Sequence, residues 1–342
     1  MRMLGRLILR CFVLGIVLAI AAFVGLEYYL SQHFVHSTRI VAIPGGTSLR
    51  GVARALTRER VIDFPGLFVL YGRLQGTSHL MKAGEYEFAD GLTARQVYDK
   101  LVRGDVRTYE VRIPEGWTLQ QIASYVAAQP FATSPKFGDE FIAACRDPAR
   151  IAKLGIVAHS LEGFLFPSTY YVQRPKSAAE LVDRLTVEFE RQFDAGLRAQ
   201  LAARGLSLLQ LVTLASIIER ETGAAVERPL VSAVFHNRLK VNMPLASDPT
   251  VIYGLPKFEG NIRRADLENP HPYNTYIHAG LPPGPIANPG RAALEAALNP
   301  AAVDYLFFVS KNDGTHFFST KYADHAAAVD RYQRRRAAPS GP

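Results

Sequence analysis

The sequence predicts an α+β protein made of an N-terminal anchor helix, a small α/β module and a larger α+β domain. Three observations predict this organisation. A long apolar run lies near the N-terminus, a strand–turn–helix pattern occurs twice before residue 130, and helical and strand-like segments then mix as far as residue 335. The length of 342 residues allows about two domains in addition to the anchor.

The apolar run is the predicted membrane anchor. Its uninterrupted part, residues 11–26, is slightly shorter than the roughly 20 residues that cross a bilayer, but Arg10 and Glu27 can reach the two interfaces. Arginines precede the run, which predicts a cytoplasmic N-terminus and places the chain after residue 30 outside the inner membrane. A cleaved signal peptide is the alternative, but no clear A-x-A site follows the run. We therefore expect an uncleaved, single-pass anchor.

Composition argues against several kinds of function. The formal net charge is +8, but no long basic run occurs before Arg334, and no basic stripe with interleaved aromatic residues indicates nucleic-acid binding. A mildly basic surface also suits anionic polymers or lipid headgroups. The two cysteines do not indicate a disulfide framework, because Cys11 lies in the apolar run and Cys145 does not. The histidines show no zinc motif, so we expect neither a metal nor a cofactor.

A repeated pattern organises the region before residue 130. The run VAIPGGTSL at residues 41–49 returns as VRIPEGWTL at residues 111–119, about 70 residues later. Each copy combines a β-branched strand, a turn with Pro and Gly, a Ser or Thr helix cap and an amphipathic helix. Between the copies, the pattern predicts a helix, a strand and a helix at residues 64–74, 82–88 and 93–102.

These strand–helix units resemble LysM-type glycan-binding modules through the signature I-P-x-G-x-[ST]-L. The resemblance implies a glycan-binding module over residues 39–130. A small α/β spacer domain without affinity for glycans accounts for the same pattern, and the sequence leaves both interpretations open.

The middle of the chain is predicted to begin with a polar, loop-rich segment at residues 134–155. The run SLEGFLFPSTYYV at residues 160–172 then clusters aromatic side chains around Pro167, with Glu162 at its front. This composition suits a sugar-binding cleft, because sugar C–H faces stack on aromatic rings and carboxylates accept hydrogen bonds from hydroxyls. A core strand with a turn is the alternative. A long, charged amphipathic helix is expected at residues 177–203.

The next helix, residues 206–225, carries the strongest candidate for acid–base chemistry. Apolar residues recur at three- and four-residue spacing, and two acids, Glu219 and Glu221, interrupt them. At about 100° per residue the two acids lie about 200° apart, so they cannot share one site. Glu221 falls on the flank of Leu214 and Ile218, where apolar neighbours raise the pKa of a carboxyl and favour a general acid. A surface acid that pairs with arginines is the alternative.

Several short runs follow one another in a specific order. They are ASIIERET (215–222), VFHNRL (234–239), DPTVIYG (248–254), YNTY (273–276), GLPPGPIANPG (280–290), YLFFV (305–309) and GTHFFST (314–320). Together with EGFLFP at residues 162–167, they resemble the endolytic murein transglycosylase family, also called YceG-like, over residues 35–335. The resemblance implies an α+β catalytic domain, and it makes Glu221, the second acid of the family's E-[KR]-E-T run, the catalytic residue.

We also expect supporting residues around the substrate. Asp248 and Thr250 are expected to orient Glu221 or an acetamido group, and Tyr273, Asn274 and Thr275 to position amide and hydroxyl groups. Glu162 and Tyr171 are expected to line the groove, and His316 and Thr320 to close its other side. The expected set is Glu162, Tyr171, Asp248, Thr250, Tyr273, Asn274, Thr275, His316 and Thr320. For each of them, a hydrogen bond inside the fold is the alternative role.

The implied function is a membrane-anchored lyase that cuts the β-1,4 bond between N-acetylmuramic acid and N-acetylglucosamine in nascent peptidoglycan. It would leave 1,6-anhydro ends and limit strand length, with peptidoglycan strands and the inner membrane as partners and peptidoglycan synthases beside them. A non-catalytic peptidoglycan-binding scaffold and a two-carboxylate muramidase, with Asp248 or Glu162 as second acid, are the alternatives. The expected parts are the anchor (1–30), a linker (31–38), the LysM-like module (39–130), the catalytic domain (131–335) and a disordered tail (336–342).

Overall fold

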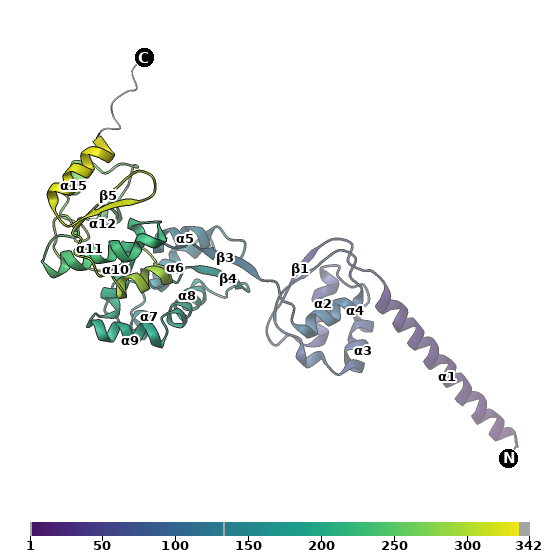
Figure 1. The fold of residues 1–342 in the computed structure, drawn as a ribbon. Helices are drawn as coiled ribbons and strands as arrows, with labels where there is room; N and C mark the ends of the chain where they lie inside the picture. Colours follow the sequence, from purple (N-terminus) through teal and green to yellow (C-terminus); the bar gives the residue numbers. More distant parts are fainter. Residues whose placement is uncertain (1, 133, 335–342) are drawn as a thin grey trace. The chain divides into compact units, whose positions relative to one another are not determined.

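The computed structural model describes residues 2–132 and 134–334 (Figure 1), so the predicted disordered tail lies outside the described residues. The chain divides into two compact units, each of which mixes helices with short strands, as the predicted α+β class requires. The smaller unit comprises Met1–Glu110 and Tyr171–Arg174, and the larger unit comprises Val111–Tyr170 and Pro175–Pro342.

The smaller unit begins with a long helix and continues with a β–α–α–β order and one further helix. Its elements are α1 (Arg2–Ser31), β1 (Arg39–Ile43), α2 (Leu49–Arg58), α3 (Pro65–Gln75), the 3₁₀ turn η1 (Ser78–Leu80), β2 (Gly84–Phe88) and α4 (Ala94–Arg103). Strands β1 and β2 pair antiparallel, with Arg39 opposite Phe88 and Ile43 opposite Gly84. The helix, strand and helix predicted between the two copies of the repeat are therefore present.

The larger unit is mainly helical, and α10 lies at its centre, packed against α11, α12 and α14. Strands β3 and β4 pair, and β5 and β6 form an antiparallel hairpin. The elements in chain order are β3 (Tyr109–Ile113), α5 (Leu119–Ala127), α6 (Phe137–Cys145), α7 (Pro148–Lys153), β4 (Ser168–Val172), α8 (Ala178–Gln192), α9 (Ala195–Arg204), α10 (Leu208–Glu221), η2 (Ala225–Glu227), α11 (Arg228–Lys240), α12 (Asp248–Gly254), α13 (Arg264–Leu267), α14 (Arg291–Leu298), β5 (Phe307–Ser310), β6 (His316–Ser319), α15 (Tyr322–Val329) and the π-helical turn η3 (Asp330–Arg334).

Both copies of the predicted strand–turn–helix pattern fold as expected. In each turn a glycine adopts the left-handed region, with φ of 75° at both Gly46 and Gly116. Ser48 caps α2, and Thr118 caps α5 in a capping box. The second copy belongs to the larger unit, because its helix α5 packs against α6, so the compact units divide the chain at a different place from the expected module boundary at residue 130.

The segment predicted as loop-rich, residues 134–155, contains the helices α6 and α7, so that prediction was wrong. Asp147 caps α7, and Pro148 occupies its first turn, where a missing amide donor costs nothing. Helix α6 packs against α5 and α8 and buries Phe137 and Phe141. Tertiary burial therefore completes α6, whereas α7 carries a local start signal that the prediction overlooked.

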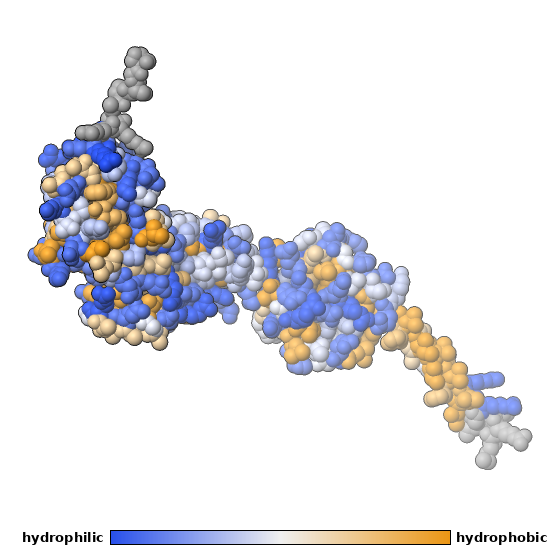
Figure 2. Space-filling model, in the orientation of Figure 1, coloured by the Kyte–Doolittle hydropathy of each residue, from blue (hydrophilic) through white to orange (hydrophobic). Residues whose placement is uncertain are grey.

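Helix α1 contains the predicted anchor. Its segment Arg6–Ser31 is long and apolar enough to cross a membrane, and Figure 2 shows α1 as an almost continuous apolar surface. The C-terminal turns of this helix are not free, because Leu26, Tyr29 and Leu30 belong to the core of the smaller unit. The hydroxyl of Tyr29 also donates a hydrogen bond to the carbonyl of Phe64 at 3.3 Å.

The predicted linker, residues 31–38, is packed as well. Val35 is buried, and its carbonyl accepts a hydrogen bond from the amide of Gly91 at 2.8 Å. The amide of Phe34 donates to the carbonyl of Leu92 at 3.3 Å. Helix α1 therefore continues into the smaller unit through packed chain rather than through a free tether.

Replacing Leu30 by alanine is expected to destabilise the smaller unit by about 2–5 kcal/mol, because the change removes a buried side chain and leaves a cavity. Tyr28→Ala is the matched control, since Tyr28 lies on the same helix with 67% of its surface exposed. Native-state hydrogen exchange at the amides of β1 and β2, in the full chain in micelles, measures the local free energy of opening. Equal exchange in the two variants would show that α1 is not part of this core.

Candidate active site

Glu221 faces a cavity of about 470 Å³ in the larger unit. The walls come from the end of α10, from α11, from α12 and the segment before it, from the β5–β6 hairpin and from α15. Its polar lining includes Glu221, Arg238, Asp248, Tyr276, Ser310 and His316, and Phe307 and Phe308 contribute to its apolar wall. The cavity thus combines a carboxyl, a guanidinium and aromatic surface.

Helix α10 places Glu221 at this cavity because the helix ends there. Ser207 begins the helix with a capping box, and residues 211–218 are all buried in the core. Thr222 leaves the helix in an extended conformation, and its amide donates to the carbonyl of Ile218. Glu221 therefore occupies the last helical position, where its side chain reaches beyond the packed core.

Burial and three neighbours set the protonation of Glu221. Burial raises the pKa of this carboxyl to about 7. The hydroxyl of Ser247 donates a hydrogen bond to Oε1, which lowers the pKa, whereas the negative charge of Asp248 raises it and the positive charge of Arg238 lowers it. Near neutral pH the carboxyl is therefore divided between its protonated and ionised forms, which suits a group that first donates and then accepts a proton.

Ser247 is held in place by two buried threonines. Its amide donates to Oγ1 of Thr275 at 3.1 Å, and Oγ1 of Thr250 donates to its carbonyl at 2.6 Å. The two threonine hydroxyls lie 2.8 Å apart and share a hydrogen bond. Because both side chains are at most 1% exposed, they act on Glu221 through Ser247 and do not reach a ligand.

Asp248 and Tyr276 form a hydrogen-bonded pair in the wall of the same cavity. The hydroxyl of Tyr276 donates to Oδ1 of Asp248 at 2.6 Å. Burial and this carboxylate raise the pKa of Tyr276, so the phenol stays protonated. Asp248 is therefore the predicted second acid that shares a cavity with Glu221.

Arg238 supplies a fixed positive charge. Its Nε donates to the carbonyl of Leu306 at 2.7 Å, and a terminal nitrogen donates to the carbonyl of Leu245 at 2.6 Å. Burial lowers the pKa of Arg238, while the negative charge of Glu221 raises it. Two main-chain carbonyls from separate segments thus hold the guanidinium of Arg238 at the cavity, where its positive charge interacts with the carboxyl of Glu221.

His316 lies at the cavity and is held by Glu227. Its backbone amide donates to Oε1 of Glu227 at 2.9 Å, and its ring Nδ1 lies 2.7 Å from Oε2. Because a carboxylate oxygen accepts hydrogen bonds, this contact assigns a ring proton to Nδ1 and leaves Nε2 for the cavity. Glu227 is itself buried, so one carboxylate fixes both the position and the ring orientation of His316.

Glu219 lies on the other flank of α10, as the helical spacing predicts. One oxygen accepts a hydrogen bond from Arg228 at 3.1 Å, and the other accepts from the amide of Gly290 at 3.0 Å. Burial raises the pKa of Glu219, and the Gly290 amide lowers it. These contacts fasten the end of the segment 280–290 to the helix.

Glu162 and Tyr273 line a second cavity of about 780 Å³, which also includes residues of α12 and of the end of α10. The two oxygens of Glu162 lie 2.9 and 3.1 Å from the amide of Leu119, and Tyr253 and Asn288 donate to them at 3.2 and 3.1 Å. Burial raises the pKa of Glu162 to about 7, and the Leu119 amide lowers it. The oxygens of this carboxyl are thus occupied by protein donors.

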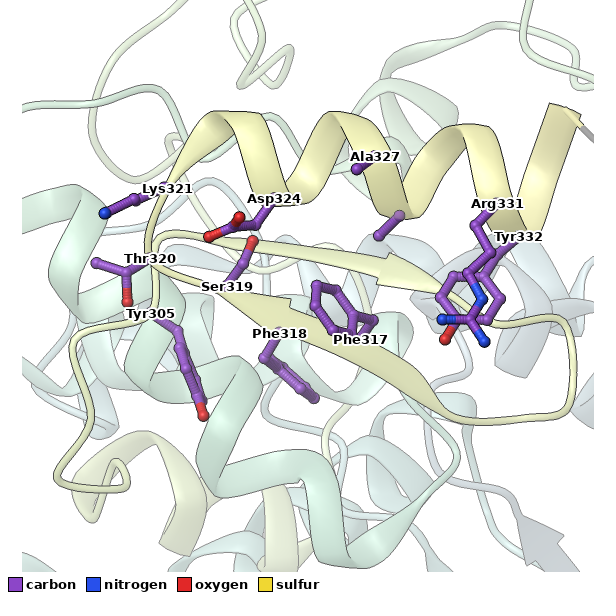
Figure 3. A pocket seen from close by; sticks show the side chains of 11 residues that line it. Tyr305, Phe317, Phe318, Ser319, Thr320, Lys321, Asp324, Ala327, Arg331 and Tyr332 are labelled. Carbon is purple, nitrogen blue, oxygen red and sulfur yellow. The ribbon is translucent and has the colours of Figure 1, made fainter.

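The three remaining predicted residues lie elsewhere. Asn274 is buried, and its amide nitrogen donates to the carbonyls of Leu267 and Asn269 at 2.9 and 2.8 Å, so it shapes its own loop. Tyr171 is exposed on β4, in the segment that groups with the smaller unit. Thr320 lines a different cavity, of about 550 Å³, between the β5–β6 hairpin and α15 (Figure 3).

Four residues at the site were not predicted from the sequence: Ser247, Arg238, Tyr276 and Glu227. Arg238 and Tyr276 stand inside the runs VFHNRL and YNTY, and Ser247 directly precedes DPTVIYG, so a local signal existed for these three. Glu227 has no such signal, because its contact with His316 joins residues 89 positions apart. Within the described part of the chain, no group of three or more His, Cys, Asp or Glu side chains is placed to hold a metal ion.

Comparison with known proteins gives a consistent family. The model of the YceG-like family matches residues 41–331. The chain is 32% identical over 307 residues to a Bacillus subtilis (strain 168) protein named endolytic murein transglycosylase, and the match covers 85% of this chain and 84% of that protein. A protein of the same name from Streptococcus pneumoniae serotype 2 (strain D39 / NCTC 7466) is 28% identical over 315 residues, which cover 83% of this chain and 56% of that protein.

The fold is also similar to a solved structure. The crystal structure of a putative yceG-like protein from Listeria monocytogenes matches with a TM-score of 0.59 and 31% sequence identity. The match covers 85% of this chain and 98% of that chain. The similarity therefore extends over nearly the whole of that structure.

Two substitutions beside Glu221 are expected to move its pKa in opposite directions. Ser247→Ala removes a hydrogen bond that favours the ionised form, so the pKa rises above about 7; Asp248→Asn removes a negative charge that disfavours it, so the pKa falls below about 7. Infrared titration of the carboxyl C=O band, assigned by subtracting the Glu221→Gln spectrum, measures both shifts.

Glu162 is the internal control for this titration, because the pKa of its carboxyl is also raised to about 7 but it lies in the other cavity. Its band, assigned with Glu162→Gln, should stay in place in both variants. Shifts of Glu221 in the same direction in the two variants would contradict the assigned roles of Ser247 and Asp248.

Proposed function

Because this chain belongs to the YceG-like family, we propose that it is a membrane-anchored endolytic murein transglycosylase. The observation that carries the proposal is Glu221, a carboxyl whose pKa burial raises to about 7, at a cavity of about 470 Å³. A cavity of this size suits a sugar-sized group. The Bacillus subtilis relative is matched along 84% of its length, which supports carrying its named activity to this chain.

The substrate is nascent peptidoglycan, and the bond is the β-1,4 link between N-acetylmuramic acid and N-acetylglucosamine. In the first step Glu221, protonated, donates its proton to the glycosidic oxygen. The bond from the anomeric carbon of the muramic acid to that oxygen breaks, and the N-acetylglucosamine leaves with a free hydroxyl. The anomeric carbon acquires oxocarbenium character, and Glu221 is left ionised.

In the second step the C6 hydroxyl of the same muramic acid attacks the anomeric carbon. A new bond from this carbon to O6 forms, and Glu221 takes the hydroxyl proton. The product is a 1,6-anhydro-muramic end, and no water is consumed. One carboxyl performs both proton transfers, so its pKa has to lie near the working pH. Cutting within nascent strands limits their length.

The neighbours of Glu221 divide the remaining tasks. Arg238 stabilises the ionised carboxyl between the two steps, because its positive charge lowers the pKa of Glu221. Ser247 keeps one carboxyl oxygen in place and leaves the other for the substrate. Asp248, held by Tyr276, can accept a hydrogen bond from the acetamido N–H of a sugar. Nε2 of His316 can accept a hydrogen bond from a sugar hydroxyl.

Helix α1 supports a proposal for the location of the chain and its orientation in the membrane. We place the N-terminus in the cytoplasm, because Arg2, Arg6 and Arg10 precede the apolar run, and the larger unit outside the inner membrane, where peptidoglycan lies. Peptidoglycan synthases are the partners that would supply nascent strands. The β–α–α–β order of the smaller unit is compatible with a LysM-like, glycan-holding role.

A two-carboxylate muramidase is the second candidate function, because Asp248 lines the same cavity as Glu221. In that reaction a water molecule attacks the anomeric carbon and leaves a reducing end, and the second carboxylate assists it. Glu162 lies in the other cavity with its oxygens occupied, so Asp248 is the acid that would serve.

Glu221→Gln is expected to lower the rate of product release from purified peptidoglycan by about 10² or more, because an amide cannot donate or accept the proton. Mass spectrometry of the soluble products should find 1,6-anhydro-muramic ends with the unchanged chain only. The full chain in micelles is required, because a fragment that starts at residue 31 would lack Leu26, Tyr29 and Leu30 of the core.

Glu190→Gln is the control, since Glu190 is an exposed acid on α8 and should leave rate and products unchanged. Reducing ends from the unchanged chain would establish the muramidase instead, and Asp248→Asn should then abolish them. In the transglycosylase, Asp248→Asn slows cutting but leaves the ends anhydro. Absence of any product from the unchanged chain would contradict both and favour a binding scaffold.

Glu227 and His316 are expected to act as one unit. Glu227→Gln and His316→Ala each slow the reaction, and the double variant is no slower than His316→Ala alone, with a coupling energy of about 0.5–3 kcal/mol. The values of kcat for the four proteins measure it, and thermal unfolding checks that each is folded. Glu190→Gln combined with His316→Ala is the matched pair. Its effects should be additive, because Glu190 is an exposed acid on α8 and the carboxylate that holds His316 is that of Glu227.

A further inference from the structure

The smaller unit carries a groove of about 580 Å³ between α2 and α3 that the proposed reaction does not use. Three arginines line it, Arg50 and Arg54 from α2 and Arg73 from α3, and apolar residues such as Val69 and Leu70 form its floor and rim. The groove therefore combines concentrated positive charge with exposed apolar surface.

The charge of this groove is not neutralised within the protein. Arg50, Arg54 and Arg58 are spaced by four residues, so they share one exposed face of α2. Arg58 pairs with the neighbouring Glu59 at 3.2 Å. In the described residues, the side chains of Arg50, Arg54 and Arg73 form neither an ion pair nor a hydrogen bond. All three guanidinium groups can therefore pair with an anionic partner.

The apolar surface beside the arginines lies on α3 and just before it. Phe64, Leu70 and Leu74 are 57%, 45% and 68% exposed. Leu70 and Leu74 are four residues apart and lie on the same side of the helix. A basic strip next to exposed Phe and Leu side chains is the pattern of a segment that lies in a membrane interface.

This surface is mounted directly on the membrane anchor. The ring of Tyr29 contacts that of Phe64, with centroids 6.0 Å apart, and α1 packs against α3 and α4. Figure 1 shows α3 and α4 beside the point at which α1 enters the unit. The apolar run ends at Leu26, so Tyr29 stands only about 5 Å further along the helix. That rise is comparable with the headgroup layer, which adds roughly 5–7 Å to each side of the hydrocarbon core.

We propose that α2 and α3 lie on the bilayer surface, where Arg50, Arg54 and Arg73 bind the phosphates of anionic phospholipids. Phe64, Leu70 and Leu74 then enter the boundary between headgroups and acyl chains. Each basic residue near an anionic surface adds to the electrostatic attraction, so three of them act together. The contact seats the smaller unit on the membrane independently of any cutting, so it does not rest on the proposed function.

Depth measurement by spin labelling tests the proposal. A nitroxide is attached at Leu74→Cys in the full chain carrying Cys11→Ser; Cys145 needs no change, because it is buried and burial raises the pKa of its thiol. In nanodiscs that contain phosphatidylglycerol, the label should become accessible to oxygen and protected from a water-soluble nickel chelate. In phosphatidylcholine nanodiscs, or at about 1 M salt, where the Debye length is about 3 Å, the protection should diminish.

Variants decide whether the arginines cause this protection. The triple change Arg50→Gln, Arg54→Gln and Arg73→Gln should abolish the difference between the two lipids. The matched control, Arg198→Gln, Arg204→Gln and Arg264→Gln in the larger unit, has the same net charge and should keep it. A label at Ala42→Cys, exposed on β1, should stay in water throughout.

Three outcomes would overturn the proposal. The label at position 74 could remain in water in anionic nanodiscs, or it could be protected equally in both lipids and in the triple variant. Protection by added soluble glycan strands in place of anionic lipid would make the groove a glycan site instead. The two-lipid difference, lost only in the triple Arg variant, is the result that supports it.

Discussion

The hydrogen bond from Ser247 to the buried carboxyl of Glu221 is the interaction on which the chemistry of the candidate site depends. Burial disfavours the ionised form of a carboxyl, and here the hydrogen bond from one serine side chain and the charge of Arg238 favour it. The turn that precedes Ser247 is strained, because Ala246 adopts a φ of 46°, which costs on the order of 1–3 kcal/mol in a non-glycine residue. The amide of Ala246 donates to the carbonyl of Thr275 at 3.0 Å, so the same loop that holds Ser247 also sustains this strain.

Two buried carboxyls show why a raised pKa does not by itself identify an acid catalyst. The pKa values of Glu162 and Glu221 are both raised to about 7, and burial is the main cause in each. The oxygens of Glu162 accept hydrogen bonds from Leu119, Tyr253 and Asn288, so this carboxyl joins three segments of the fold. Glu221 has one side-chain donor and faces an open cavity, so a proton on it can be delivered. Unused acceptor sites, rather than the pKa, distinguish the two.

Much of the fold was predictable because its signals are local. The repeated run predicted both strand–turn–helix units, and helical spacing alone placed Glu221 and Glu219 on opposite flanks of α10. Helix α6 was missed because it is completed by tertiary burial of Phe137 and Phe141, whereas α7 carries a local start signal, Asp147 followed by Pro148, that the prediction overlooked. In the site, the role of Ser247 depends on a contact 26 residues away and that of Glu227 on one 89 residues away. Such pairs arise from tertiary packing, so no pattern within a single element could predict them.

The packing of Leu26, Tyr29 and Leu30 into the smaller unit gives the anchor a second property besides retention at the membrane. A domain joined to its anchor by a flexible linker can lie at any distance from the membrane that the length of the linker allows. Here the spanning helix runs into the folded unit without a hinge, and the following segment is pinned by Phe34 and Val35. The smaller unit is therefore held at a fixed height above the hydrocarbon core of the bilayer. A ligand of the smaller unit must therefore come to that height above the membrane in order to be bound.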